Sequence, residues 1–340
     1  MKTKQIVFTD VGIAKLFDSD VPEPKENEIA VKTEFSSISC GTERANLAGD
    51  PNISIGKLDP SAPIKFPRFT GYSTSGTVIK TGAAVTDLKP GDKVAMCWTV
   101  HKAINVIPEH NAVKIPEGLS MQDAALCNIA TFPLAAVRKT KVELGESMLI
   151  MGLGILGLFA VQFARAAGAV PVIAVDPVEA RRKKALEFGA DYALDPTAPG
   201  FADEVKRLTG GGANTAVEVT GLGIGLDQCL DCMARFGRVA LLGCTRDKNF
   251  TIDYYRKVHG PGVQLIGAHT LARPKFESSP GYFTQRDDMR AILNLCATGR
   301  ISLAGTVDEV FSPSDCESVY NRLMTDRNFP VVSQFDWRNM

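Results

Sequence analysis

The sequence carries no excess of either charge: its 340 residues include 38 Lys and Arg against 38 Asp and Glu. Nucleic acids and anionic membranes attract proteins with basic patches, so this balance predicts neither partner. No apolar run approaches the roughly 20 residues of a membrane-spanning helix, and residues 1–10 lack the apolar core of a signal peptide. We therefore expect a cytoplasmic protein whose partners are a small-molecule substrate and copies of the same chain, in a homodimer or homotetramer.

Closely spaced metal ligands are also scarce. The chain has four histidines, and its eight cysteines are scattered through apolar stretches, which is typical of a reducing compartment rather than of a disulfide framework. Cys229 and Cys232 have the spacing of zinc ligands. However, Leu226, Cys229, Leu230 and Met233 follow the i, i+3, i+4, i+7 pattern of one helix face, so we expect these cysteines to pack in a core.

A glycine-rich turn follows a short apolar segment at residues 147–157 and leads into an apolar helix. Gly152 permits the tight turn, Gly154 lets the backbone approach a pyrophosphate, and Gly157 lets the helix pack against its strand. Asp176 lies 19 residues after Gly157, where a carboxylate binds both ribose hydroxyls of NAD and repels the 2′-phosphate of NADP. The segment predicts an NAD(H) site that includes Gly152, Gly154, Ile155, Leu156, Gly157 and Asp176.

Two patterns divide the chain. Up to about residue 121, short strand-like runs with frequent turns predict a small, partly open β-barrel. From 122 to 270, strand-like runs alternate with helical stretches, and six such runs make a doubly wound parallel sheet. These runs span 148–151, 172–175, 192–194, 215–219, 238–242 and 263–266. A polar loop, a helix near 287–297 and further strand-like pieces follow, so the expected fold class is α/β.

The segment 71–94, from Gly-Tyr-Ser-Thr-Ser-Gly to Pro-Gly-Asp-Lys-Val, closely resembles the barrel signature of the medium-chain dehydrogenase/reductase (alcohol/polyol dehydrogenase) superfamily. The Cys40-Gly-Thr-Glu43 segment before it and the glycine fingerprint after it stand in that family's order. The resemblance implies a GroES-like β-barrel catalytic domain of residues 1–121 and 271–340, a Rossmann NAD-binding domain of residues 122–270, and an active site in the cleft between them. It also implies hydride transfer between a secondary alcohol, such as a polyol, sugar or cyclic alcohol, and a ketone.

Zinc-dependent members of that family bind a catalytic metal through residues that this chain lacks. Cys40 stands at one ligand position, but Tyr72 and Ser73 replace a His and a Glu, and Asn128 stands near the place of a Cys or Glu. A catalytic zinc needs about three protein ligands. The departures therefore imply a metal-free, zinc-independent branch, similar to the subgroup named bacteriochlorophyllide a dehydrogenase-like.

Without zinc, other groups must polarise the reacting oxygen or accept its proton. The resemblance places Cys40, Thr42, Glu43 and Tyr72 near the nicotinamide, and His269 can face the cofactor pocket. Thr42 matches the hydroxyl that relays the alcohol proton, Tyr72 can donate from its phenol, and Glu43 can orient either group or act as a base. The alternative is structural: Cys40 fills apolar space, while Glu43 and His269 make hydrogen bonds that hold the fold.

The resemblance adds four cofactor-binding residues. Arg181 corresponds to a cation near the adenosine ribose, although a solvated position in a run of four cations is the alternative. Thr220 and Gly243 end strands of the parallel sheet, where ligands of such sheets bind. Ala268 lies where backbone groups meet the nicotinamide carboxamide. His101 begins a barrel-strand segment and is expected to line the cleft.

Two other functions remain open: a quinone or enone reductase, and a non-catalytic NAD-binding protein. The reductases usually carry an Ala-Ala-x-Gly-x-Gly loop and prefer NADPH, which disfavours them here. A short-chain dehydrogenase is excluded because neither Tyr254 nor Tyr255 is followed four residues later by Lys. Two polar segments, 46–69 and 271–288, either border the cleft and suit a polyhydroxylated or acidic substrate, or are solvated loops.

Overall fold

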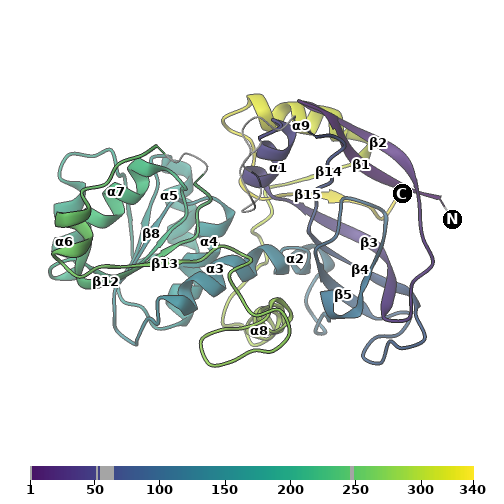
Figure 1. The fold of residues 1–340 in the computed structure, drawn as a ribbon, viewed down its shortest axis with the longest axis horizontal. Helices are drawn as coiled ribbons and strands as arrows, with labels where there is room; N and C mark the ends of the chain where they lie inside the picture. Colours follow the sequence, from purple (N-terminus) through teal and green to yellow (C-terminus); the bar gives the residue numbers. More distant parts are fainter. Residues whose placement is uncertain (1, 51–52, 54–64, 246–248) are drawn as a thin grey trace. The chain divides into compact units, whose positions relative to one another are not determined.

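The computed structural model describes residues 2–50, 53, 65–245 and 249–340, so much of the polar segment 46–69 lies outside the described residues. The chain forms two compact units, a split unit of residues 1–129 and 289–340 and a central unit of residues 130–288 (Figure 1). The expected boundaries were 121/122 and 270/271. Residues 122–129 instead group with the split unit, where the Ala125 carbonyl accepts hydrogen bonds from Ser37 and Ser73. Residues 271–288 group with the central unit, where Asp288 pairs with Arg138 and Arg273.

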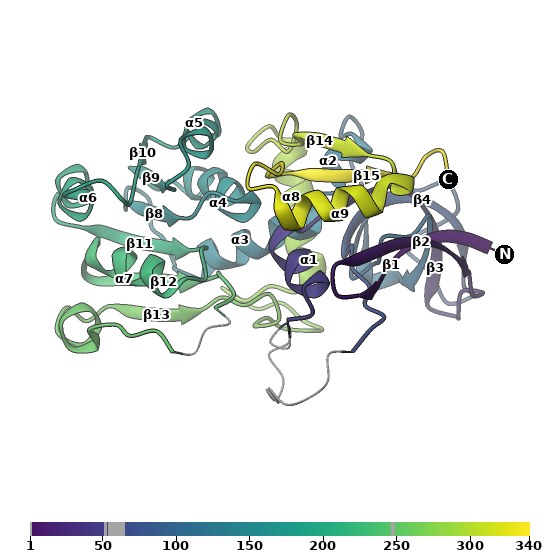
Figure 2. The same cartoon turned by 90° about the horizontal axis from the view of Figure 1, so that it is seen from above.

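The central unit is built on a six-stranded parallel sheet with the order β10-β9-β8-β11-β12-β13, which Figure 2 shows from β10 to β13. In chain order this is 3-2-1-4-5-6, so the doubly wound sheet expected from the sequence is confirmed. β8 and β9 are buried at every position, as strands covered on both faces are. The strands are β8 (Met148–Met151), β9 (Val172–Val175), β10 (Tyr192–Leu194), β11 (Ala213–Glu218), β12 (Met233–Leu241) and β13 (Gln264–Gly267).

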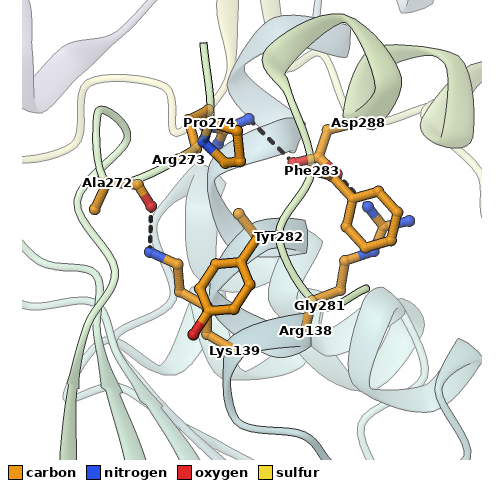
Figure 3. Close-up of a pocket in the computed structure, with 10 residues that line it drawn as sticks. Arg138, Lys139, Ala272, Arg273, Pro274, Gly281, Tyr282, Phe283 and Asp288 are labelled. Carbon is orange, nitrogen blue, oxygen red and sulfur yellow. Dashed lines mark hydrogen bonds and ion pairs between the residues drawn. The ribbon is translucent and has the colours of Figure 1, made fainter. Parts of the chain in front are cut away.

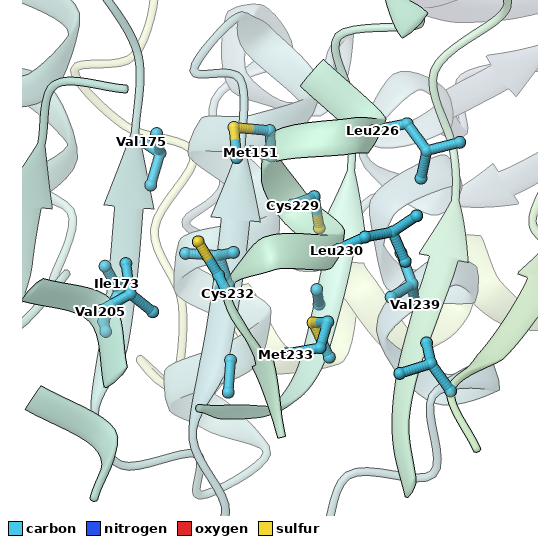
Figure 4. Close-up of a cluster of buried hydrophobic side chains, with 14 of the residues drawn as sticks. Met151, Ile173, Val175, Val205, Leu226, Cys229, Leu230, Cys232, Met233 and Val239 are labelled. Atoms are coloured by element: carbon cyan, nitrogen blue, oxygen red, sulfur yellow. The ribbon is translucent and has the colours of Figure 1, made fainter. Parts of the chain in front are cut away.

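Helices pack on this sheet and close its core. α4 lies on β8 and β9, and α7 lies on β8 and β11. Cys229 and Cys232 are fully buried in a cluster with Leu230 and Val239 (Figure 4), so their predicted place in a core is confirmed. Burial raises the pKa of the Cys232 thiol to about 12. The helices are α4 (Ile155–Ala166), α5 (Glu179–Glu187), α6 (Phe201–Thr209) and α7 (Gly223–Asp231), with a π-helical turn at Tyr255–His259.

The split unit contains a seven-stranded sheet, in which β14-β15-β3-β4-β5-β7 are neighbours and β6 pairs with β3, and a separate β1-β2 ribbon. One core lies among β3, β4 and β5, and a second packs Phe8, Tyr320, Phe335 and Trp337 beside the ribbon. The strands are β1 (Lys2–Asp10), β2 (Ile13–Asp20), β3 (Glu28–Ile38), β4 (Ser73–Thr81), β5 (Lys93–Cys97), β6 (Ile104–Pro108), β7 (Ala112–Lys114), β14 (Glu309–Phe311) and β15 (Ser333–Asp336).

Short helices complete this unit, and two longer ones pass from one unit to the other. α3 (Cys127–Lys139) crosses between residues 129 and 130, and α8 (Gln285–Ala297) crosses between residues 288 and 289. Within the described residues, no helix has both the length and the apolar character that crossing a bilayer requires. The remaining elements are α1 (Cys40–Leu47), α2 (Met121–Ala124), α9 (Cys316–Thr325) and 3-10 turns at Glu109–Asn111 and Pro313–Asp315.

Candidate active site

The glycine turn between β8 and α4 has the geometry of a phosphate loop. Gly152 adopts φ +99°, which disfavours any residue with a side chain. A Cβ atom on Gly157 would lie 1.9 Å from the Gly152 carbonyl oxygen, so only glycine permits this helix to start so close to its strand. Gly154 caps α4 without a side-chain hydrogen bond, and a Cβ there would meet nothing within 4 Å. The first-turn amides of α4 therefore face open space into which an anion fits.

Asp176 ends β9 beside this turn and is 3% exposed. Its Oδ2 accepts a hydrogen bond from the Leu153 amide at 2.9 Å, and its Oδ1 accepts one from the Val178 amide at 2.8 Å. Arg181 Nη1 lies 3.5 Å from Oδ2, whereas Arg182 donates to the Asp176 carbonyl at 2.7 Å and thus holds the backbone. The sequence-predicted residues Gly152, Gly154, Gly157, Asp176 and Arg181 are therefore brought together at one edge of the sheet.

The neighbouring strand ends add a residue that sequence reasoning missed. Glu218 ends β11 and is buried, and its carboxylate accepts hydrogen bonds from the Thr220 hydroxyl and from the Thr220 amide, the latter at 2.8 Å. Burial raises the pKa of Glu218, and the hydrogen bonds from Thr220 and Gly221 oppose that shift. A Cβ on Gly243 would lie 2.2 Å from the Gly221 amide, so β11 and β12 end in close backbone contact. The sequence signal that could have identified Glu218 is its place as an acidic residue at the end of the strand-like run 213–218.

His269 and Ala268 follow β13 at the same edge of the sheet. The Ala268 amide donates to the Leu241 carbonyl at 3.0 Å, and the Leu271 amide donates to His269 Nδ1 at 3.2 Å. Because Nδ1 accepts, we assign the proton of the neutral ring to Nε2. Burial and then the nearby Lys139 ammonium lower the pKa of His269, so the ring is a neutral donor at pH 7.

Tyr72 is the centre of a second polar group in the split unit. Its hydroxyl donates to Ser39 Oγ at 2.5 Å, and its carbonyl accepts from Asn128 Nδ2 at 2.7 Å. Ser39 precedes α1 in the N-cap position, but its side chain makes no cap hydrogen bond. Cys40 and Thr42 lie partly buried in the first turn of the same helix. The structure therefore brings Cys40, Thr42, Tyr72 and Asn128 into one region.

Glu43 does not face this region as a free base. Its side chain is fully buried, and its carboxylate accepts hydrogen bonds from the Ser39 amide at 2.9 Å and from the Tyr320 hydroxyl at 2.6 Å. His101 Nε2 lies 3.2 Å from both carboxylate oxygens. These donors occupy the carboxylate oxygens, so the surroundings of Glu43 agree with the alternative that it makes hydrogen bonds that hold the fold.

His101 likewise lies inside the split unit and is fully buried, rather than lining a cleft. Its Nδ1 is 2.6 Å from Ser36 Oγ, which also accepts from Trp337 Nε1 at 2.7 Å. With the ring proton on Nε2, His101 donates to Glu43 and accepts from Ser36, and every polar atom of the set has a partner. We refer to Glu43, His101, Tyr320, Ser36 and Trp337 as the Glu43 network.

Comparisons with known proteins agree with this architecture. The family model of the alcohol dehydrogenase GroES-like domain matches residues 25–133, and that of the zinc-binding dehydrogenases matches residues 156–279. The chain is 28% identical over 287 residues to D-guloside 3-dehydrogenase of Escherichia coli (strain K12), covering 80% of this chain and 82% of that one. It is 31% identical over 284 residues to L-threonine 3-dehydrogenase of Thermococcus kodakarensis, covering 75% and 78%. A crystal structure of a dehydrogenase-like protein of Sinorhizobium meliloti 1021 bound to NADP has a TM-score of 0.80 over 99% of both chains, at 22% identity.

The fold is thus an α/β fold that joins a GroES-like domain to a Rossmann-type sheet. The chain belongs to the medium-chain, zinc-binding dehydrogenase superfamily and is an oxidoreductase of the alcohol dehydrogenase type.

The side chains at the family's zinc position do not fit that metal. Ser73 donates its hydroxyl to the Ala125 carbonyl at 2.7 Å, Asn128 presents an amide, and Tyr72 presents a phenol. The Cys40 thiol lies 3.7 Å from the Pro330 carbonyl. Among the residues that the structure describes, no three His, Cys, Asp or Glu side chains gather as a metal site would require. One thiol among neutral oxygen and amide groups is a poor donor set for zinc.

Proposed function

We propose that the chain interconverts a secondary alcohol and a ketone with NAD(H), without a catalytic zinc. The observation that carries this proposal is the hydrogen bond from the Tyr72 hydroxyl to Ser39 Oγ, because Tyr72 stands at one of the family's metal-ligand positions and Ser39 directly precedes Cys40, which stands at another. A phenol and a serine hydroxyl can move a proton, whereas they make poor zinc ligands. The two relatives named above are dehydrogenases of hydroxyl-bearing compounds, which supports a polyol, sugar or cyclic alcohol as substrate.

The turn between β8 and α4 fits a nicotinamide dinucleotide, because Gly154 leaves space for a pyrophosphate and Gly157 sets the helix close to its strand. When bound, the nicotinamide accepts or supplies the hydride. Asp176 supports NAD(H) over NADP(H), since its carboxylate suits ribose hydroxyls and repels a 2′-phosphate. Arg182 is engaged with the Asp176 carbonyl and with Asp195, which leaves Arg181 as the nearest cation for such a phosphate.

The chain's own hydroxyl groups provide a route for the substrate proton. The Tyr72 hydroxyl donates to Ser39 Oγ, and because a phenol oxygen is an acceptor as well as a donor, a substrate hydroxyl would donate its hydrogen bond to Tyr72 Oη. As the alcohol is oxidised, its proton passes to Tyr72 Oη, the Tyr72 proton passes to Ser39 Oγ, and the Ser39 proton leaves to solvent. Thr42 can stabilise the developing alkoxide with a second hydrogen bond. Ketone reduction follows the same route in reverse.

Purified enzyme tests the proposal. Formation of NADH should be measured with polyols, sugar acids and cyclic alcohols as substrates. Enones should be tested as substrates for the reductase alternative. Elemental analysis should give the zinc content. Tyr72→Phe and Ser39→Ala should lower kcat by about a hundredfold or more while the Kd for NADH stays unchanged. Tyr192→Phe, which removes an exposed phenol on β10, is the matched control.

Three results would contradict the proposal. Stoichiometric zinc with loss of turnover on chelation would restore a metal mechanism. Unchanged kcat in both Tyr72→Phe and Ser39→Ala would remove the hydroxyl route. Binding of NADH without turnover of any substrate in the panel would favour the non-catalytic alternative.

A further inference from the structure

A pocket lies in the central unit where the segment 272–288 folds over the C-terminal turn of α3 (Figure 3). That turn ends in two adjacent cations, Arg138 and Lys139. Every residue of the lining belongs to residues 130–288, and none of them is part of the dinucleotide turn or of the Tyr72 region. We call this feature the α3 pocket; it is lined by Ala135, Arg138, Lys139, Ala272, Arg273, Pro274, Gly281, Tyr282, Phe283 and Asp288.

The α3 pocket contains three cationic side chains and one carboxylate. Asp288 is 1% exposed and pairs with both Arg138 and Arg273, the latter at 3.0 Å. Arg273 also donates through Nε to the Thr270 carbonyl at 2.9 Å, so it holds the segment in place. A single carboxylate cannot balance three cations, and burial together with the nearby Arg273 lowers the pKa of Lys139. The lining therefore has uncompensated positive charge.

Two of the cations also retain hydrogen-bonding capacity. Arg138 donates to Asp288 through Nη1 and stacks over the Phe283 ring, with its guanidinium carbon 4.0 Å from the ring centroid. Its side chain remains 27% exposed, and a guanidinium has five N–H donors. Lys139 Nζ donates to the Gly267 carbonyl at 3.0 Å and to the Ala272 carbonyl at 2.7 Å, which uses two of its three N–H groups.

We propose that the α3 pocket binds a small anion, a phosphate or carboxylate group, through Arg138 and Lys139, with the Tyr282 hydroxyl as a third donor. Arg138 is already oriented by Asp288 and Phe283, so its fork is preorganised for a planar or tetrahedral anion. The hollow is shallow and open to solvent, so it does not take a dinucleotide, and the anionic group would bind at its mouth, where Arg138 remains partly exposed.

Isothermal titration calorimetry tests this site in protein saturated with its reduced dinucleotide, so that the turn at Gly152–Gly157 cannot bind the added anion. Inorganic phosphate and malonate are titrated separately at constant ionic strength, and the tighter of the two identifies a phosphate or a carboxylate ligand. We expect saturable binding of one anion per chain. A charge-assisted hydrogen bond contributes about 1.5–3 kcal/mol, so Lys139→Gln should weaken binding about tenfold or more.

Lys141→Gln is the matched control. Lys141 lies two residues after Lys139, carries the same charge, and has an exposed side chain outside the pocket, so the Kd of this variant should equal that of the wild type. Tyr282→Phe is a second variant at a side chain that is 53% exposed, where folding is not at risk, and it should weaken binding severalfold. The proposal is overturned if neither anion binds saturably. It is equally overturned if Lys139→Gln and Tyr282→Phe bind as the wild type does, which would reveal an adventitious ion only.

Discussion

Replacing Tyr320 by Phe removes one hydroxyl from the Glu43 network and leaves the ring in place. The ring packs edge-on against Phe8 with centroids 4.8 Å apart, so the hydrophobic contacts persist. Burial and the neighbouring Glu43 raise the pKa of Tyr320 well above its ordinary value, so its hydroxyl is protonated and donates to Glu43 at 2.6 Å. A hydrogen bond to a buried charged group contributes about 1.5–3 kcal/mol. We expect Tyr320→Phe to lower the free energy of unfolding by about 2 kcal/mol and to leave kcat nearly unchanged.

Urea unfolding followed by tryptophan fluorescence suits this measurement, because both tryptophans lie in the split unit and the buried Trp337 belongs to the Glu43 network itself. Tyr192→Phe in the central unit serves as control and should stay within about 0.5 kcal/mol of the wild type. Loss of kcat by about a hundredfold at unchanged stability would refute the reasoning, since Glu43 would then act as the base that Tyr320 orients. A double-mutant cycle with Glu43→Gln measures the coupling directly.

Three further predictions test other parts of the structure. Asp176→Ser should weaken NADH binding about tenfold and NADPH binding less. Fluorescence titration measures both affinities, with the surface variant Asp203→Ser as control. Equal losses for the two cofactors would contradict the role of Asp176 at the ribose. Gly157→Ala should lower both the free energy of unfolding and the affinity for NADH, because its Cβ would lie 1.9 Å from a carbonyl oxygen. Gly154→Ala should lower the affinity alone, because its Cβ would meet nothing within 4 Å. A loss of stability in Gly154→Ala but not in Gly157→Ala would contradict the packing argument. Burial raises the pKa of Asp288 to about 6 although two arginines oppose the shift, so the stability that it contributes is present below about pH 4 and is lost as pH rises to about 6. The stability of the wild type relative to Asp288→Asn should therefore fall by about 3 kcal/mol between these pH values in urea titrations, and a flat difference would contradict the shift.

The parallel sheet was predictable because its central strands β8, β9 and β11 are almost wholly buried and therefore stand out in the sequence as apolar runs. β8, β9 and β10 have the bounds that the apolar runs predict, and β11, β12 and β13 differ only at their ends. The limits of the compact units were not predictable, because a polar loop such as 271–288 carries no apolar pattern. The position of this loop depends on the ion pairs of Asp288 with Arg138 and Arg273. Because Arg138 precedes Asp288 by 150 residues, no local sequence pattern records that contact.

The candidate site also has one part that the sequence predicts and one part that it does not. The dinucleotide turn follows from local backbone requirements at Gly152 and Gly157, which the spacing of glycines records. The surroundings of Glu43 depend on Tyr320, 277 residues further along, so no local pattern distinguishes a catalytic acid from a buried one. Zinc independence, the preference for NAD(H), the narrower subgroup, the cytoplasmic location and the homo-oligomer stay predictions.

Ser39 joins the two polar systems of the split unit through different atoms. Its backbone amide donates to Glu43, which ties the start of α1 to Tyr320 and His101 in the core. Its hydroxyl, which in an N-cap position would ordinarily accept from a helix amide, accepts from Tyr72 instead. The Cys-Gly-Thr-Glu segment therefore has a use that does not depend on a metal: Glu43 fixes the position of Ser39, and Ser39 orients the Tyr72 phenol. Because the fixing uses the backbone and the orientation uses the side chain, stability and proton transfer can be changed separately at this one residue.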